Sequence, residues 1–253
     1  MDKLVARCTH VVHFAAETHV TRSIAENRLF FETDVIGTQT VLNACLEHRE
    51  KIRGIIHVST SEVYGTARLA LGEKMDEGHA LAPMSPYAAA KCGADRLAWS
   101  YYITYRLPIT IVRPFNNYGP RQHIEKVVPR FITCALLHES LPIHGGGHAE
   151  RDFVYVGDTV RAIAKLMLVA GMRPDIYNIA SGDARSILAI AADVLGLAAP
   201  ATGAMSHHLA DRPGQVDRHI GDSARVAAAI DWTPAVSWAA GLAATFDWYV
   251  QHQ

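Results

Sequence analysis

Residues 54–65 read GIIHVSTSEVYG, an apolar run followed at once by hydroxyls, an acid and a turn. Its isoleucines and valine suit a buried strand, whereas Ser59, Thr60 and Glu62 are costly to bury without partners. In α/β folds, binding and catalytic groups gather at the carboxyl ends of parallel strands. The stretch therefore predicts a buried strand that carries polar side chains into a site.

Strands and helices alternate on both sides of this stretch. The pattern predicts strands at 11–16, 54–59, 109–114 and 175–180, and helices at 27–48, 85–105, 124–138, 157–170, 186–196 and 236–251. Such alternation is typical of a parallel sheet covered by helices. We therefore expect an α/β fold with a doubly wound, Rossmann-like parallel sheet. Longer loops rich in glycine and proline after residue 115 predict a smaller C-terminal lobe.

The composition excludes several classes of protein. The chain has 253 residues, 49% of them hydrophobic and 19% charged, with a formal net charge of −1. This balance provides no basic field for nucleic acid, and no apolar stretch reaches the roughly 20 residues needed to cross a bilayer. Scattered cysteines without a CxxC pair, and scattered histidines, predict no metal site. The charged start lacks the apolar core of an export signal, so we expect a cytoplasmic protein.

Tyr87 and Lys91 form a YxxxK pair on the predicted helix 85–105. Positions four apart lie on one face of a helix, so the ammonium would favour the phenolate and lower the pKa of the tyrosine. Such a phenol can take a proton from an alcohol while hydride leaves for a nicotinamide ring. Alone, the pair is far more typical of a surface tyrosine and lysine on an alanine-rich helix, so its neighbours decide between the two interpretations.

The ends of two predicted strands supply those neighbours. Ser59 and Thr60 place hydroxyls at the end of the strand before the helix, and Ala15 and Ala16 place small residues at the end of the strand before that. Hydroxyls can bind a reacting alcohol, and small residues let a flat cofactor approach the backbone. Together with the YxxxK pair they predict an oxidoreductase-like site.

Nine stretches of the chain together resemble the extended short-chain dehydrogenase/reductase family of NAD-dependent epimerases and dehydratases. They are HFAAETHVTRSI (13–24), DVIGT (34–38), HVSTSEVYGT (57–66), SPYAAAK (85–91), RPFNNYGPRQHIEKVVPRFI (113–132), LPIHGGG (141–147), RDFVYVGDT (151–159), YNIASG (177–182) and DRPGQVDRHI (211–220). They cover nearly the whole chain in order and are most similar to dTDP-glucose 4,6-dehydratase-like proteins. The resemblance implies NAD as the cofactor and a nucleotide-diphosphate sugar as the substrate.

The resemblance also implies a reaction. Thr60 would hydrogen-bond the sugar 4-hydroxyl, Tyr87 would be the base, and Lys91 would hold Tyr87 and the nicotinamide ribose. Hydride would pass from sugar C4 to NAD+, Glu62 would remove the C5 proton, water would leave from C6, and the hydride would return to C6. The product would be a 4-keto-6-deoxy sugar.

Two sets of binding residues follow from the same resemblance. Those facing the cofactor would be Phe14, Ala15, Ala16, Glu17, Thr18, Thr33, Ser59, Tyr87, Lys91 and Asn117. Those around the sugar and its diphosphate would be Thr18, His19, Thr60, Asn116, Lys126, Val127, Pro142, Ile143, His144, Arg151, Asn178, Arg212 and Gln215. Arginines suit the second set because a guanidinium gives forked, charge-assisted hydrogen bonds to phosphate.

Two positions depart from the dTDP-glucose pattern. Ser61 stands where those enzymes usually have an aspartate that protonates the leaving hydroxyl, and Asp34 stands where relatives commonly have asparagine. Ser61 followed by Glu62 also resembles GDP-mannose 4,6-dehydratases, in which the glutamate can make both proton transfers, and UDP-glucuronate decarboxylases. We keep Ser61 among the catalytic candidates. An epimerase or a decarboxylase of the same family stays open, although DRPGQ at 211–215 favours a dehydratase.

The family's glycine-rich turn, GxxGxxG, does not occur in the first half of the chain. The resemblance implies a chain that begins just before the fourth strand of the family's sheet, without the pyrophosphate cradle. We then expect 1–120 to form a partial NAD-binding domain to which about 150–180 return, and 121–253 to form mainly the sugar-nucleotide lobe. The strand 11–16 would be an exposed edge and NAD would bind weakly. A non-catalytic sugar-nucleotide binder is the alternative.

The helices 27–48 and 85–105 bear on the oligomeric state. They resemble helices that form a four-helix dimer interface in relatives, so we expect a homodimer. The same apolar faces could instead pack on the chain's own sheet. Neither nucleic acid nor a membrane is expected as a partner.

Overall fold

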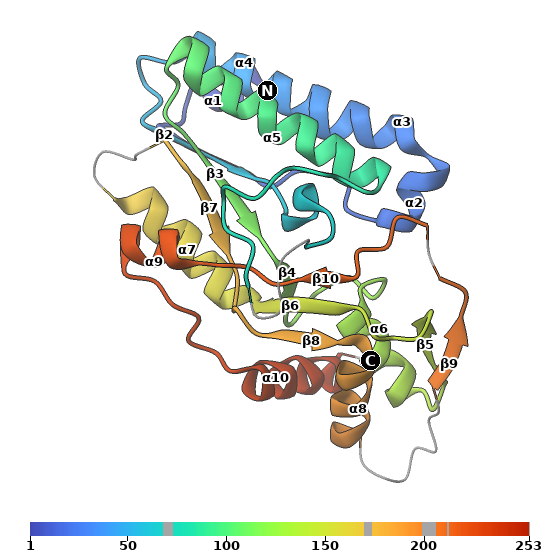
Figure 1. The fold of residues 1–253 in the computed structure, drawn as a ribbon. Coiled ribbons are helices and arrows are strands. Elements are labelled where there is room, and N and C mark those ends of the chain that lie inside the picture. The colour runs from blue at the N-terminus through green and yellow to red at the C-terminus, as the bar shows by residue number, and fades with distance from the viewer. Residues whose placement is uncertain (68–72, 170–173, 199–205, 212, 253) are drawn as a thin grey trace.

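A four-stranded parallel sheet forms the centre of the computed structural model, which describes residues 1–67, 73–169, 174–198, 206–211 and 213–252. Its strands lie in the order β1 (His10–His13), β2 (Gly54–Val58), β3 (Ile109–Pro114) and β7 (Ile176–Ile179) (Figure 1). Every neighbouring pair runs parallel. The predicted parallel α/β sheet is therefore confirmed, although its first strand ends at His13 and not at residue 16.

Helices cover both faces of this sheet. On one face lie α1 (Asp2–Val5), α4 (Gly37–Glu47) and α5 (Pro86–Tyr105), and on the other lie α7 (Val156–Leu168) and α9 (Ala224–Ile230) (Figure 1). Alternate strand residues serve the two faces: Ile55 belongs to the core under α4 and α5, whereas Ile56 belongs to the core under α7. Burial on both faces explains why the strands read as continuous apolar runs.

The predicted helix 27–48 is a chain of three helical segments. They are α3 (Asn27–Phe30), the π-helical segment η1 (Phe31–Ile36) and α4, and a short helix α2 (Val20–Ala25) precedes them. A π-helical turn holds one residue more than an α-helical turn, so it changes which side chains face inward. Within η1, Asp34 is buried while Phe31 and Ile36 are exposed.

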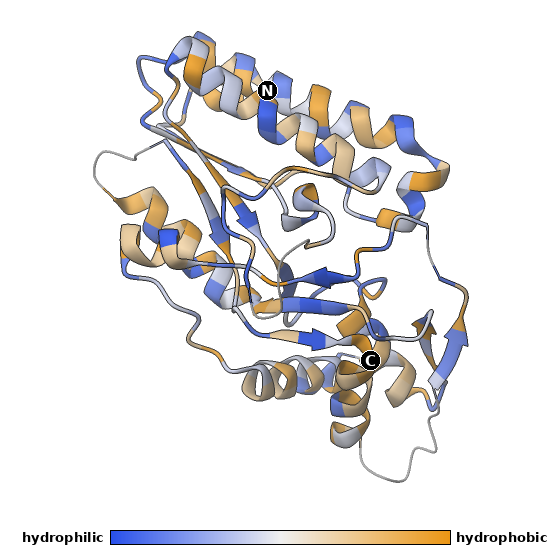
Figure 2. Ribbon diagram, viewed as in Figure 1, coloured by the Kyte–Doolittle hydropathy of each residue, from blue (hydrophilic) through white to orange (hydrophobic). Residues whose placement is uncertain are grey.

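The second half of the chain builds the C-terminal layer at the bottom of Figure 1. Its strands are β4 (Asn116–Tyr118), β6 (Glu150–Tyr155), β8 (Ala184–Ser186) and β10 (Arg218–His219), with a separate pair β5 (Leu141–His144) and β9 (Ser206–Leu209). Its helices are α6 (Val127–Leu136), α8 (Ile187–Leu197) and α10 (Trp238–Gln251). Figure 2 shows hydrophobic residues prevailing on α8 and α10 and hydrophilic residues on β10. The helices thus bury a second core, while β10 carries polar groups.

β1 is an edge strand, since it pairs only with β2 in the described part of the chain. Val12 on the strand and Phe14 just after it are exposed. Exposed apolar residues at an edge agree with the expectation from the sequence. No helix in the described ranges is long and apolar enough to cross a membrane.

A buried ion pair fixes α5 on the sheet. Arg113 of β3 and Asp95 of α5 are both buried, and the guanidinium donates to the carboxylate from Nε to Oδ2 (2.9 Å) and from Nη2 to Oδ1 (3.0 Å). Burial alone raises the pKa of Asp95, but the hydrogen bonds and charge of Arg113, with the charge of Arg96, bring it down to about 2. Arg113 also donates to the Tyr64 hydroxyl (2.8 Å). The pair therefore sets the position of α5 relative to β2 and β3.

We expect Asp95→Asn to lower the free energy of unfolding by about 3–5 kcal/mol, because it leaves the buried guanidinium without its counter-ion. Urea unfolding followed by circular dichroism measures this. The difference from the parent protein should be largest above about pH 4 and shrink toward about pH 2, since a lowered pKa in the folded state means that the stabilisation is lost as Asp95 takes up its proton.

The exposed pair Arg49–Glu50, with Nε and Oε1 3.4 Å apart, is the control. Glu50→Ala should change the free energy of unfolding by less than about 1 kcal/mol. Equal effects of the two substitutions would show that the buried pair does not hold α5.

Candidate active site

The polar stretch after β2 lies at the carboxyl end of that strand. Thr60 begins the 3₁₀-helix η2 (Ser61–Tyr64), and its side-chain oxygen accepts a hydrogen bond from the Glu62 N–H (3.2 Å). Gly65 ends η2 with φ 69°, and a Cβ there would lie 2.2 Å from the Ala82 carbonyl oxygen. Glycine is thus required at this turn. The local sequence holds Thr60 and Glu62 at the strand's end.

The Tyr87 side chain meets this stretch from the first turn of α5. Ser85 caps that helix by accepting from the Ala88 N–H (3.1 Å), and Pro86 occupies the first helical position. The Tyr87 side chain is buried, and the Thr60 side chain lies close enough to act on the pKa of its phenol. Tyr87 from α5 and Thr60 from the end of β2 thus lie near each other.

The pKa of Tyr87 moves in the opposite direction from our expectation. Burial raises it above its usual value of about 10, the hydrogen bond with Thr60 opposes the rise, and the negative charges of Glu62 and Asp34 add to it. The sequence predicted a lowered pKa from the Lys91 ammonium. That prediction is wrong because burial raises the pKa of Tyr87 and the negative charges nearby act in the same direction.

Lys91 lies one helical turn beyond Tyr87 and is 4% exposed. Its ammonium donates to the Val58 carbonyl oxygen (2.8 Å) at the end of β2. Burial lowers the pKa of Lys91, and the carboxylates of Asp34 and Asp95 oppose that change. The lysine is therefore attached to the same strand end as Thr60.

Ser61 has a partner that the sequence did not reveal. The serine is buried, and its Oγ lies 3.4 Å from Nδ1 of His219 on β10. Burial, reinforced by the charge of Arg151, lowers the pKa of His219 to about 3, so the imidazole is neutral at neutral pH. A neutral imidazole beside the hydroxyl does not make Ser61 a proton donor of useful strength.

The residues expected to face the cofactor lie on the loop after β1, on η1 and after β2. Phe14, Ala15 and Thr18 are exposed, Ala16, Glu17 and Thr33 are half-buried, and Ser59 is buried. The Ser59 hydroxyl makes no hydrogen bond within the described part of the chain. Small side chains and a buried hydroxyl without a protein partner, next to Lys91 and Tyr87, fit a flat ring with an attached ribose.

Asn117 belongs to the same predicted set but has other contacts. Its Oδ1 accepts from the Thr159 hydroxyl (2.6 Å), and its Nδ2 donates to the Phe115 carbonyl oxygen (3.2 Å). The side chain therefore joins β4 to α7.

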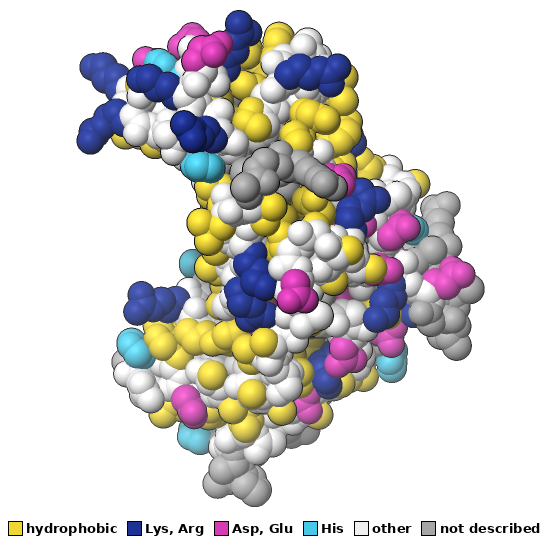
Figure 3. Space-filling model, turned by 90° about the vertical axis from the view of Figure 1, so that its left-hand side faces the viewer, with side chains coloured by type: hydrophobic (Ala, Val, Ile, Leu, Met, Phe, Trp, Pro, Cys, Tyr) yellow, Lys and Arg dark blue, Asp and Glu magenta, His cyan; other side chains and the backbone are white. Residues whose placement is uncertain are grey.

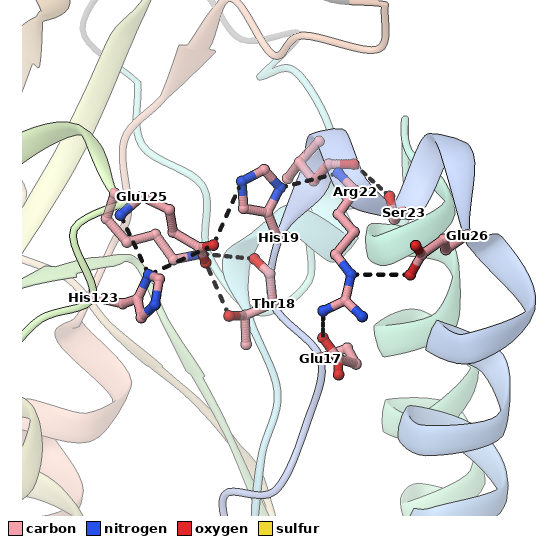
Figure 4. Close-up of polar contacts among 10 residues, drawn as sticks. Glu17, Thr18, His19, Arg22, Ser23, Glu26, His123 and Glu125 are labelled. Carbon is pink, nitrogen blue, oxygen red and sulfur yellow. Dashed lines mark hydrogen bonds and ion pairs between the residues drawn. The ribbon is translucent and has the colours of Figure 1, made fainter. Parts of the chain in front are cut away.

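Three of the residues expected around the sugar lie together, on two loops far apart in the sequence. Lys126 Nζ donates to the Thr18 carbonyl oxygen (2.7 Å), and His19 Nε2 lies 3.6 Å from an oxygen of Glu125. Figure 4 shows His19 and Thr18 facing Glu125 across the gap between these loops. Polar contacts thus close the C-terminal layer onto the loop after β1.

Two other residues of the predicted sugar set are buried inside the fold. Asn178 is completely buried: its Oδ1 accepts from the Tyr64 hydroxyl (2.8 Å) and its Nδ2 donates to the Met75 carbonyl oxygen (3.0 Å). Ile143 is also completely buried. These two side chains therefore point into the fold and not into the site. Similarity of sequence motifs indicates where a residue lies along the backbone, but not where its side chain points.

The remaining sugar-set residues have mixed surroundings. Asn116 donates to the Asp152 carbonyl oxygen (3.1 Å), and Arg151 donates to those of Glu150 and Val216. His144 Nδ1 lies 3.1 Å from the Ala210 carbonyl oxygen and Gln215 donates to Asp211 (3.3 Å). Val127 and Pro142 are half-buried, and Arg212 lies outside the described residues.

The surface of the molecule is hollowed between its two parts. Figure 3 shows a notch at one edge, between the helical layer at the top and the C-terminal layer at the bottom, with lysine and arginine side chains above and below it. A separate cavity of about 780 Å³ lies in the C-terminal layer, lined among others by Arg185, Trp238 and Asp193. No predicted site residue lines that cavity, so it is not the site described above.

Comparisons with known proteins agree with the fold and the motifs. The family model for GDP-mannose 4,6 dehydratase matches residues 1–245. The dTDP-glucose 4,6-dehydratase of Streptomyces niveus is 38% identical over 249 residues, which are 98% of this chain and 72% of that protein. A dTDP-glucose 4,6-dehydratase from an Actinoplanes strain is 39% identical over 98% of this chain and 76% of its own length.

Solved structures give the same result. The dTDP-glucose 4,6-dehydratase of Streptomyces venezuelae, crystallised with NAD bound, has a TM-score of 0.90 and 38% identity, covering 99% of this chain and 77% of its own. The UDP-glucuronic acid 4-epimerase of Bacillus cereus, in complex with UDP-glucuronic acid and NAD, has a TM-score of 0.93 and 28% identity, covering 100% and 78%. With its parallel sheet and this similarity along nearly the whole chain, the protein belongs to the GDP-mannose 4,6 dehydratase family.

Proposed function

We propose that the protein catalyses the NAD-dependent dehydration of a nucleotide-activated hexose to a 4-keto-6-deoxy sugar. The observation that carries this proposal is the gathering of Thr60, Glu62, Tyr87 and Lys91 at one strand end, where Thr60 and Glu62 act on the Tyr87 phenol and Lys91 donates to the Val58 carbonyl oxygen. The dehydratases similar to this chain, some of them solved with NAD, support the cofactor and the reaction class.

The arrangement gives each side chain a task. Thr60 binds the sugar 4-hydroxyl, and Tyr87 takes its proton as C4 is oxidised. NAD+, when bound, supplies the hydride acceptor and a positive charge that favours ionisation of Tyr87. Glu62 removes the C5 proton, which the new 4-keto group makes acidic, and delivers it to the hydroxyl that leaves C6 as water. Return of the hydride to C6, with a proton from water added at C5, then gives the 4-keto-6-deoxy product. Ser61 has no part in these proton transfers and instead positions η2 through its contact with His219.

The binding roles divide along the chain. We assign 1–120, with the returning segment about 150–180, to the nicotinamide end of NAD, and 121–253 mainly to the sugar nucleotide. Lys126 with Thr18 and His19 supports this division, because a lysine at the junction of the two parts can bind a diphosphate. We place the protein in the cytoplasm.

A 4-epimerase is the second candidate. The Bacillus cereus UDP-glucuronic acid 4-epimerase superimposes with a TM-score of 0.93, and Thr60, Tyr87 and Lys91 would serve the first step of either reaction. The two differ after C4 oxidation, because a dehydratase needs a carboxylate that can reach C5 and C6. Glu62, a carboxylate near Tyr87, can take that role, which favours the dehydratase.

We also propose a homodimer through the outer surface of α4, α5 and η1. Phe31 and Ile36 on η1, with Ile103 and Tyr105 on α5, are exposed apolar side chains on these helices. A second copy of the same surface would bury them in an isologous interface.

Tyr87→Phe should lower turnover by about 100-fold or more, because it removes the hydroxyl that accepts the sugar proton. The assay supplies several nucleoside-diphosphate hexoses with excess NAD+ and measures the 4-keto product. Tyr105→Phe, the same change at the far end of α5, should leave turnover unchanged. Full activity in the Tyr87 variant would rule out the proposed base.

Glu62→Gln should stop the reaction after the first oxidation, because the amide cannot remove the C5 proton. Absorbance of reduced nicotinamide should then accumulate while no product lacking water forms, as mass spectrometry can show. Glu32→Gln, at an exposed carboxylate on η1, is the control. Unchanged dehydration by the Glu62 variant, or an inverted product of unchanged mass from the parent protein, would contradict the assignment.

Ile36→Glu should convert the dimer to a monomer, since it puts a charge in the apolar interface. Light scattering coupled to size-exclusion chromatography reports the mass. Leu168→Glu, at an exposed leucine that ends α7 on the opposite face of the sheet, should leave the dimer intact. A monomeric parent protein, or a variant that stays dimeric, would disprove this interface.

A further inference from the structure

β10 and the residue before it join the C-terminal layer to the polar stretch after β2. β10 pairs with β6, and the Asp217 carbonyl oxygen accepts from the Glu150 N–H of that strand (2.8 Å). Figure 1 shows β10 beside β6, at the upper edge of the C-terminal layer. The Asp217 N–H also donates to the Thr66 hydroxyl (3.2 Å), and the Arg218 carbonyl oxygen accepts from the Ala67 N–H (3.0 Å). The segment is therefore bonded both to β6 and to the chain that follows η2.

His219 of β10 contacts η2 itself. Its side chain is completely buried, and its Nδ1 lies 3.4 Å from Oγ of Ser61, the first residue of η2. The ring also packs against Phe115, with the ring centroids 5.2 Å apart, while Nε2 makes no hydrogen bond within the described part of the chain. Burying an imidazole is costly unless its nitrogens find partners, so the contact with Ser61 explains a histidine here better than ring packing does.

A part in proton transfer does not fit His219. Burial and the charge of Arg151 lower its pKa to about 3, so the imidazole is neutral at neutral pH. The contact can instead fix the orientation of η2, in which Glu62 directly follows Ser61. Arg151 itself donates to the Val216 carbonyl oxygen, so a residue of the expected sugar set is bonded to the same segment as His219.

We propose that His219 is a positioning residue of the active site: through Ser61 it fixes η2, and with it the Glu62 carboxylate, on the C-terminal layer. The catalytic meaning of this role rests on the proposed function, in which Glu62 acts at C5 and C6 of the sugar. A carboxylate that serves two neighbouring carbons needs a fixed backbone, since a misplacement of about 1 Å can cost about 100-fold in rate.

Two substitutions separate the polar contact from the ring packing. His219→Phe keeps a ring against Phe115 and removes Nδ1, whereas His219→Asn keeps a polar atom near the position of Nδ1 and loses the ring. Hydrogen exchange of peptides that cover 61–65, read by mass spectrometry without sugar or cofactor, reports local opening of η2. We expect exchange about fivefold faster in His219→Phe, the size of effect of one lost hydrogen bond, and close to the parent rate in His219→Asn.

His207→Phe is the matched control, because it makes the same change at an exposed histidine of β9 in the C-terminal layer. It should leave the exchange of 61–65 unchanged. The proposal is overturned by unchanged exchange in His219→Phe, by equal changes in the two phenylalanine variants, or by exchange in His219→Asn as fast as in His219→Phe.

Ser61→Ala tests the contact from the other side and keeps the test valid should His219→Phe fold poorly. It removes the hydroxyl that meets Nδ1, so exchange of the same peptides should again be about fivefold faster. Exchange at the parent rate in Ser61→Ala would show that the contact does not hold η2.

Turnover supplies a readout that a merely structural role would not move. In the assay with nucleoside-diphosphate hexoses and excess NAD+, His219→Phe should lower kcat about tenfold and leave KM within about twofold of the parent value. His219→Asn should recover most of kcat. A raised KM with unchanged kcat would contradict the positioning role. Faster exchange in His219→Phe of a protein that dehydrates no sugar would support that role and refute the proposed function.

Discussion

The buried pair between Arg113 and Asp95 is the constraint on which the rest of the site depends. It ties α5 to β3, and through the Tyr64 hydroxyl it also reaches η2 and Asn178 of β7. Because α5 carries Tyr87 and Lys91 while η2 carries Glu62, one polar network fixes the positions of the two halves of the site relative to each other. A pair that is costly to bury is thus placed where it determines geometry.

Electrostatics around Tyr87 follow from that placement. Burial raises the pKa of Tyr87 and lowers that of Lys91, and the charges of Glu62 and Asp34 add to the rise at Tyr87. Tyr87 therefore keeps its proton at neutral pH, and the carboxylates of Asp34 and Asp95 oppose the lowering of the Lys91 pKa by burial.

The sequence predicted the parts of this fold that depend on local pattern. The strand 109–114 is observed with its predicted bounds, and the helix 85–105 differs only in that Ser85 is its cap. The π-helical segment at Phe31–Ile36 escaped prediction, since apolar spacing does not separate a π-turn from an α-turn.

The direction of the Tyr87 pKa shift was also missed because it depends on burial, which only the packed fold defines. The contact of Ser61 with His219 joins residues 158 positions apart, so no short motif could reveal it. The motifs that contain Asn178 and Ile143 were identified correctly in the sequence, but motif similarity could not show that these two side chains are buried.

The central claim is that one site at the end of β2 moves hydrogen from C4 to C6 of a single sugar. A nucleoside-diphosphate hexose carrying deuterium at C4 tests this directly, with the position of the label in the product read by NMR. The account predicts a 4-keto-6-deoxy product that carries the deuterium at C6. Deuterium that returns to C4 in a product of unchanged mass would contradict it and would establish an epimerase instead.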